Sequence, residues 1–121
     1  MNNVGEIINT EEIIKKSREF DANELLYLLK NSKGIYVFWS WGAHNFVVDK
    51  KNGTRMFRMT VNGHHHKGYV YIFLNFLDLF DVYLTTKDGT IVKKTEGDGL
   101  YFDELVDWID ENVEKVPEYD K

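Results

Sequence analysis

Three consecutive histidines, His64, His65 and His66, are the residues of this chain best suited to chemistry. If a strand runs through them, His64 and His66 project to the same side, and imidazole nitrogens at that spacing can bind zinc, nickel or copper. His44 could add a third ligand only if its turn folds near theirs. A polar turn between two strands explains the cluster more simply, because no third ligand stands at a fixed spacing. A metal-binding protein or metal-dependent enzyme using His64 and His66 is therefore an alternative hypothesis.

The sequence offers little support for any other catalytic site. Ser40 and His44 are four residues apart, but no Gly-x-Ser-x-Gly motif surrounds the serine. The chain has no cysteine, which excludes a cysteine nucleophile, a disulfide framework and a thiolate metal site. No phosphate-binding loop or dinucleotide fingerprint occurs. The sequence therefore leans away from catalysis and predicts no cofactor.

Charge is distributed unevenly along the chain, whose net charge is −5. Residues 44–67 contain five basic residues against Asp49 alone, a net charge of +4, together with all four histidines. Residues 96–121 contain ten acidic and two basic residues, a net charge of −8. Segregated charge of this kind indicates a contact surface.

The leading hypothesis is a non-enzymatic interaction or adaptor module that binds a macromolecular partner, a protein, through these two regions. The basic, histidine-containing hairpin region would contribute Lys50, Lys51, Arg55, Arg58 and Lys67. The acidic face of the C-terminal helix would contribute Asp107, Asp110, Glu111 and Glu114. Charge complementarity between such surfaces and a partner gives specificity and fast association.

Binding of single-stranded nucleic acid is a second alternative, because the same basic residues, together with Tyr36, Trp39 and Trp41 elsewhere in the expected sheet, could form a basic, aromatic platform. Aromatic stacking and phosphate pairing would supply the binding energy. However, the chain is acidic overall and carries no RNA-recognition consensus, helix-turn-helix or zinc finger. Buried tryptophans and solvated lysines are the simpler interpretation.

The length and composition indicate one domain spanning residues 1–121. A chain of 121 residues with 43% hydrophobic residues can bury a sizeable core. The first residues lack the basic start and apolar run of a signal peptide. The most apolar window is interrupted by Asn75, Asp78 and Asp81, so a membrane span is not expected. We therefore expect a cytoplasmic protein.

The elements that must position these side chains are organised around residues 68–86. Val70 and Ile72 would point to one face of a strand, and Tyr71 and Phe73 to the other. Both faces are apolar, which is typical of a strand covered on two sides.

Turn and capping signals divide the rest of the chain. Asn9 and Asp21 each precede a glutamate by three residues, a spacing that predicts two N-terminal helices. Phe102, Leu105, Val106, Ile109 and Val113 form the apolar stripe of a C-terminal helix. Strands are predicted over residues 34–41, 46–49, 54–62, 69–74, 79–86 and 91–96, with a turn at Asn52 and Gly53 between the second and the third.

These elements predict an α+β fold, an antiparallel meander of about five or six short strands with N-terminal helices and a C-terminal helix packed on one face. The second apolar face of the sheet then needs its own cover. A strongly curved sheet, closing toward a barrel, would cover it from within; a homodimer would cover it from a second copy. The curved sheet is the preferred expectation.

Overall fold

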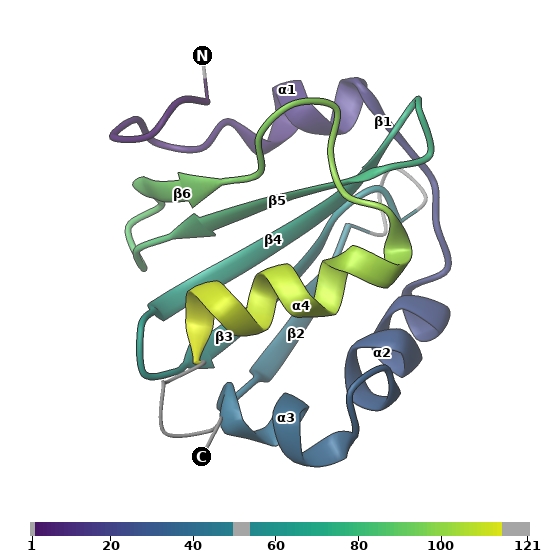
Figure 1. Cartoon of the computed structure of the whole chain (residues 1–121). Coiled ribbons are helices and arrows are strands. Elements are labelled where there is room, and N and C mark those ends of the chain that lie inside the picture. Colours follow the sequence, from purple (N-terminus) through teal and green to yellow (C-terminus); the bar gives the residue numbers. More distant parts are fainter. Residues whose placement is uncertain (1, 50–53, 115–121) are drawn as a thin grey trace.

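A computed structural model describes residues 2–49 and 54–114, which form an α+β fold (Figure 1). The helices are α1 (Thr10–Lys15), α2 (Ala22–Asn31), α3 (Ile35–Ser40) and α4 (Phe102–Val113). The strands are β1 (Ser17–Arg18), β2 (His44–Val48), β3 (Phe57–Asn62), β4 (Lys67–Asn75), β5 (Phe80–Thr85) and β6 (Ile91–Lys94). The predicted class and the antiparallel meander are confirmed. The turn expected at Asn52 and Gly53 lies outside the described residues.

The six-stranded sheet has the order β2-β3-β4-β5-β6, with every neighbouring pair antiparallel. The short strand β1 pairs with the end of β4, where Ser17 lies opposite Asn75. The turn between β5 and β6 forms where it was expected: Gly89 has a φ of +94°, and its amide donates to the carbonyl of Thr86 at 3.0 Å. The sheet therefore follows from successive hairpins.

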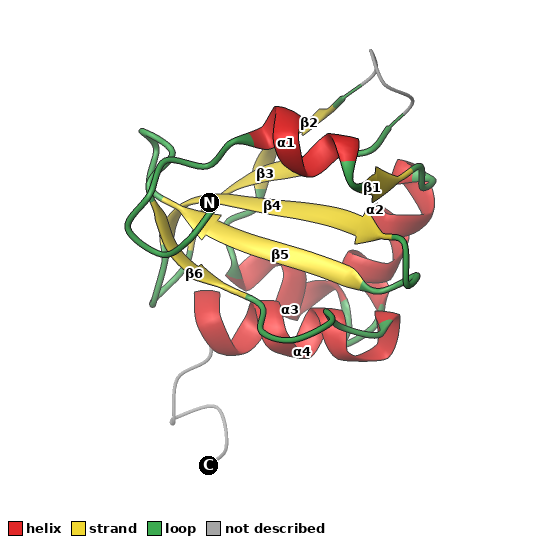
Figure 2. Ribbon diagram, turned by 90° about the horizontal axis from the view of Figure 1, so that it is seen from above, coloured by secondary structure: helices red, strands yellow, loops and turns green. Residues whose placement is uncertain are grey.

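The main core lies between the sheet and the helices α2, α3 and α4. Figure 2 shows α3 and α4 on one side of the sheet. Alternate residues of the strands point into this layer, as a period of two requires. Its fully or nearly fully buried members include Leu25, Leu29, Phe57, Met59, Val61, Val70, Ile72, Val82, Leu84, Leu105, Val106, Ile109 and Val113. Val70 and Ile72 share the strand face that points into this core, as expected, and Phe57, Met59 and Val61 of β3 point into it as well.

The opposite face of the sheet is covered by α1, which corrects two expectations. Ile13 and Ile14 of α1 pack with Tyr71 and Phe73 in a second apolar cluster, and Figure 2 shows α1 across the sheet from α4. The sheet is not strongly curled, and the N-terminal helices do not all share one face with α4. Because α1 supplies the missing cover within the chain, neither a closing barrel nor a second copy is needed to bury that face.

Residues 35–40 form a helix, so the strand predicted over 34–41 is wrong. Gly34 precedes this helix with a φ of +94°, and the amide of Val37 donates to the Gly34 carbonyl at 3.2 Å. Phe38 and Trp41, three residues apart, are buried, whereas Trp39 is 61% exposed. A short run that is apolar at nearly every position fits both a period of two and a period near three, and here helical packing prevails.

The predicted helix caps are confirmed. The side chain of Asn9 accepts a hydrogen bond from the amide of Glu12 at 3.2 Å. The side chain of Asp21 accepts from the amides of Asn23 at 2.8 Å and Glu24 at 3.3 Å. Within the described parts of the chain, no helix is long and apolar enough to cross a membrane.

Candidate functional site

The three histidines form the turn between β3 and β4, and this turn contacts the C-terminal end of α4. The amides of His65 and His66 both donate to the carbonyl of Val113, at 2.7 and 3.3 Å. The amide of His64 donates to a carboxylate oxygen of Glu114 at 3.1 Å. The bonds from His65 and His66 satisfy a backbone carbonyl that the end of the helix leaves without an intrahelical partner. The turn therefore acts as a cap for α4.

Gly63 makes this close approach feasible. A Cβ atom at residue 63 would lie 2.3 Å from the carbonyl oxygen of Val113. Such a distance is far inside van der Waals contact, so only glycine fits without a shift of the turn or of α4.

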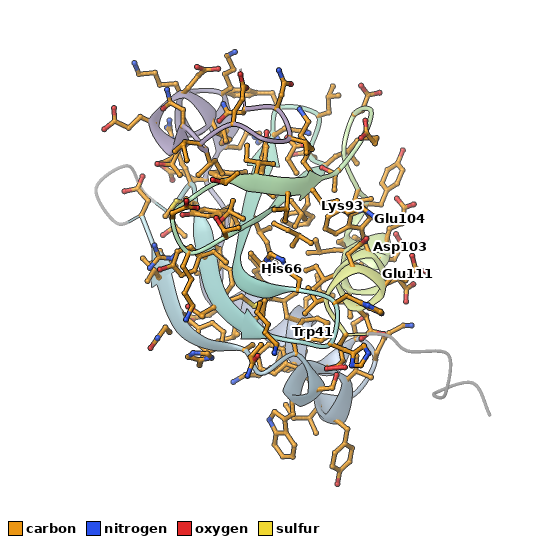
Figure 3. The ribbon with its side chains drawn as sticks, turned by 90° about the vertical axis from the view of Figure 1, so that its left-hand side faces the viewer. Trp41, His66, Lys93, Asp103, Glu104 and Glu111 are labelled. Carbon is orange, nitrogen blue, oxygen red and sulfur yellow. The ribbon has the colours of Figure 1, made fainter. Side chains whose placement is uncertain are left out.

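The side chains of the histidines occupy different environments. His66 is buried, and its Nε2–H donates to the Tyr69 carbonyl at 3.2 Å. Burial lowers the pKa of His66 below its usual 6.5, and hydrogen bonds to the carbonyls of Tyr69 and Thr85 offset part of that shift. His64 is exposed, with its ring edge-on to that of His65 at 5.2 Å. Figure 3 shows His66 inside the fold.

The buried His66 ring has only one nitrogen that could bind a metal. The ring nitrogen that faces Tyr69 is already engaged in a hydrogen bond, and neutral imidazole has only one further nitrogen to offer. His44 lies on β2, where its Nδ1 is 2.6 Å from the carbonyl oxygen of Gly42. In residues 2–49 and 54–114, no group of three or more histidine, aspartate or glutamate side chains could hold a metal ion. Metal binding at His64 and His66 stays a prediction.

Arg55 and Arg58 lie on the side of the sheet that α1 covers. Arg55 lines a depression of about 530 Å³ together with α1 residues, and Arg58 lines a neighbouring one beside Tyr69. The guanidinium carbon of Arg58 is 4.4 Å from the centroid of the Tyr69 ring, a cation–π contact. Lys67 is exposed at the start of β4. Lys50 and Lys51 lie outside the described residues.

Each arginine has one buried nitrogen atom that forms no hydrogen bond with the described residues. These atoms are the Nε of Arg55 and the Nε of Arg58. The terminal nitrogen of Arg55 lies 4.0 Å from the carboxylate of Glu19, on a side chain that is 37% exposed. A pair this long at the surface contributes little to stability. The arginines are therefore held mainly by packing of their aliphatic stems and, for Arg58, by the tyrosine ring.

The acidic residues of α4 divide into two groups. Asp103, Asp107 and Glu111 are exposed along the outer face of the helix, and Asp107 forms an ion pair with Lys33. Figure 3 shows Asp103 and Glu111 on this face. Asp110, in contrast, is buried, and its carboxylate accepts a hydrogen bond from the Trp41 indole at 3.0 Å. Its burial removes it from the acidic surface to which the helical spacing had assigned it.

Glu114 is also set apart from the solvent-facing carboxylates, because it is half-buried and bonded to the histidine turn. The structure thus joins one residue of the acidic set to the basic, histidine-containing region. This contact lies at the C-terminal end of α4 and leaves Asp103, Asp107 and Glu111 facing outward.

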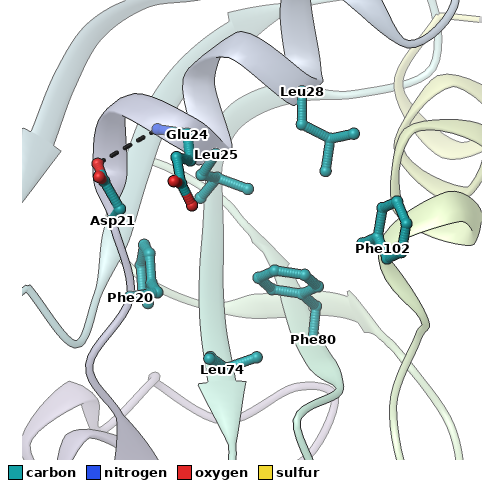
Figure 4. A pocket seen from close by; sticks show the side chains of 8 residues that line it. All are labelled: Phe20, Asp21, Glu24, Leu25, Leu28, Leu74, Phe80 and Phe102. Atoms are coloured by element: carbon teal, nitrogen blue, oxygen red, sulfur yellow. Dashed lines mark hydrogen bonds between the residues drawn. The ribbon is translucent and has the colours of Figure 1, made fainter.

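A cleft near the N-terminal end of α4 was not predicted from the sequence. It has a volume of about 410 Å³, within the range of ligand-binding pockets. Figure 4 shows its lining, which is apolar except at the start of α2. The lining residues are Phe20, Asp21, Glu24, Leu25, Leu28, Leu74, Phe80 and Phe102. The signal that could have indicated it is Phe102, which heads the apolar stripe of α4 but is 64% exposed.

No family model matches the chain, and comparisons with curated proteins and with solved structures found no match.

Proposed function

We propose that this chain is a non-enzymatic interaction module that binds a protein partner through the carboxylates on the outer face of α4. The observation that carries the proposal is the row of exposed Asp103, Asp107 and Glu111, which stand four residues apart on a helix and therefore share one face. The partner that fits this row presents lysines or arginines at a similar spacing.

The neighbourhood of the row supports contact with a partner. The exposed ring of Phe102 and the apolar cleft lie at the same end of α4 as Asp103. Carboxylates around an apolar centre reproduce the usual plan of a protein interface, a desolvated centre within a polar rim.

The basic region forms the second surface of the proposed module. Arg55 and Arg58 lie on the α1 side of the sheet, across the sheet from α4. An acidic patch of a partner would fit this side. Because the two surfaces lie on opposite faces, they can be altered separately.

Charge reversal on α4 tests the proposal. The variant Asp103→Lys/Glu111→Lys changes the net charge by the same amount as the control Glu96→Lys/Asp98→Lys, whose sites are also exposed but lie outside α4 and line neither the cleft nor the depressions beside Arg55 and Arg58. The tagged wild type and both variants are used for affinity purification from the cells that produce the chain. We expect the partner recovered by the wild type to be retained by the control, lost by the α4 variant, and released as salt is raised. Equal recovery with the α4 variant would contradict the proposal.

A further inference from the structure

The cleft exists because the apolar stripe of α4 extends beyond the core that covers it. Leu105, Val106 and Ile109 are buried against the sheet. Phe102 continues the same stripe one turn earlier, but it meets the cleft instead of a packed neighbour. Figure 4 shows Phe102 and Phe80 facing Leu25 and Leu28 across the cavity. The stripe therefore ends in an open apolar site.

The charge around the cleft selects a cationic ligand. Asp21 and Glu24 are the two ionisable residues in its lining, and both are exposed carboxylates. Asp21 also accepts hydrogen bonds from the first amides of α2, so the positive end of this helix is already satisfied by a side chain of the protein. Asp103 follows Phe102 directly and adds another exposed carboxylate. An anionic group would be repelled here.

We propose that the cleft between α2 and α4 is an anchor site for a large apolar side chain carried by a lysine- or arginine-rich segment of the partner. This inference rests on the proposed function and specifies the chemistry of the partner. The apolar side chain would lie against Phe80, Leu74 and Phe102, and flanking cations would pair with Asp21, Glu24 and Asp103. Anchors of this kind, buried at the centre of an interface and flanked by charge pairs, provide most of the binding energy of many complexes.

A second copy of this chain is a poor occupant of the cleft. The chain has a net charge of −5, and a two-fold dimer through this surface would place the same carboxylates against each other. Like charges at an interface disfavour association. The charge of the rim therefore argues for a basic partner rather than for self-association.

The test is a titration of the nitrogen-15-labelled, 121-residue chain with three defined peptides, monitored by amide chemical shifts. The first peptide has a central tryptophan flanked on both sides by lysines, the second has serine in place of tryptophan, and the third has glutamates in place of the lysines. We expect saturable shifts at Leu25, Leu28 and Phe102 with the first peptide only. The second and third peptides should bind about tenfold more weakly or not at all, since each lacks one of the two required features.

Two variants separate the apolar contact from the charge. Phe102→Ser removes one wall of the cleft, and Tyr36→Ser is the matched control, because Tyr36 is 80% exposed on α3 and does not line the cleft. Glu24→Lys reverses one rim charge at an exposed site, and it tests the same cleft if the Phe102 variant fails to fold. We expect Phe102→Ser and Glu24→Lys each to weaken binding of the first peptide about tenfold, and Tyr36→Ser to leave it unchanged.

The outcomes distinguish this inference from the proposed function. Equal binding of the lysine peptides with tryptophan and with serine, unaffected by Phe102→Ser, would overturn the anchor site while leaving an acidic contact surface on α4. Stronger binding of the glutamate peptide would overturn the preference for a cation. Absence of binding by all three peptides would overturn the anchor site, and the affinity purification described above would still decide the proposed function independently.

Discussion

Replacement of Trp41 by phenylalanine should destabilise the protein strongly, because Trp41 is the buried partner of a buried carboxylate. Trp41 is 0% exposed, and its indole nitrogen donates to Asp110 at 3.0 Å. Phenylalanine removes this donor and leaves the Asp110 carboxylate without it in a desolvated position. A hydrogen bond to a charged group contributes about 1.5–3 kcal/mol, and the smaller ring leaves a space whose cost adds to this. We therefore expect the free energy of unfolding to fall by about 2–4 kcal/mol.

Urea denaturation followed by far-ultraviolet circular dichroism measures this loss without relying on tryptophan fluorescence. Trp39→Phe is the matched control, since the same substitution at a largely exposed indole should change the free energy of unfolding by no more than about 0.5 kcal/mol. Asp110→Ala and the double variant complete a thermodynamic cycle, in which we expect a coupling energy of about 1–2 kcal/mol between Trp41 and Asp110. A Trp41→Phe midpoint equal to that of Trp39→Phe, or zero coupling, would refute the assignment of this pair as a buried hydrogen bond.

Two further predictions concern the histidine turn. Gly63→Ala should lower the free energy of unfolding by about 1–3 kcal/mol through overpacking, because its Cβ would lie 2.3 Å from the Val113 carbonyl; Gly97→Asn, at a site with φ +64° and nothing within 4 Å, is the control in the same denaturation assay. The lowered pKa of His66 means that the unfolded chain binds a proton more readily than the folded one, so this residue's contribution to stability is present above about pH 6.5 and is lost as pH falls through the folded pKa. His66→Gln should therefore make unfolding midpoints less sensitive to acidification between pH 7.5 and 5, and an unchanged pH dependence would contradict this reasoning.

The parts of the fold that could be predicted from the sequence are those in which a local signal and tertiary packing agree. The sequence predicts Asn9 and Asp21 as helix caps, and each makes the expected bond. Val70 and Ile72 alternate with Tyr71 and Phe73 along β4, and all four are buried. A strand with apolar residues on both faces indicates that both faces are buried, whichever elements bury them. The meander could be predicted for this reason. The sequence did not indicate that α1 covers the second face of the sheet.

The errors occur where a local pattern fits two structures. In residues 35–40, aromatic and β-branched side chains occupy both faces of a hypothetical strand, so the period that would identify a helix is hidden. Only the tertiary structure shows that Phe38 and Trp41 are buried together while Tyr36 is exposed. Asp110 illustrates the same limit, since its helical position is compatible with an exposed carboxylate until the indole of Trp41 is found beside it.

The cleft could not be predicted, because it depends on how far two helices separated by some 70 residues lie apart at one end. The periodicity of α4 indicates that Phe102 belongs to the apolar stripe, and this is correct. Periodicity does not indicate whether a neighbouring element packs against this first turn of α4. Helix α2 contributes Leu25 and Leu28 to the lining but leaves a volume of about 410 Å³ between them and Phe102.

The position of the charged residues in the fold argues against a single partner that binds the basic and the acidic region together. The sequence places a basic and an acidic region far apart in the chain, which suggests one partner that recognises both. In the structure, Arg58 lies on the α1 side of the sheet and Asp107 on the outer face of α4, with the sheet and its core between them. Neighbouring packed layers of secondary structure lie about 10 Å apart. A compact partner bound to α4 therefore cannot reach Arg58 without extending around an edge of the sheet. A partner of α4 should therefore be insensitive to Arg58, and a partner of the arginine side insensitive to Asp107.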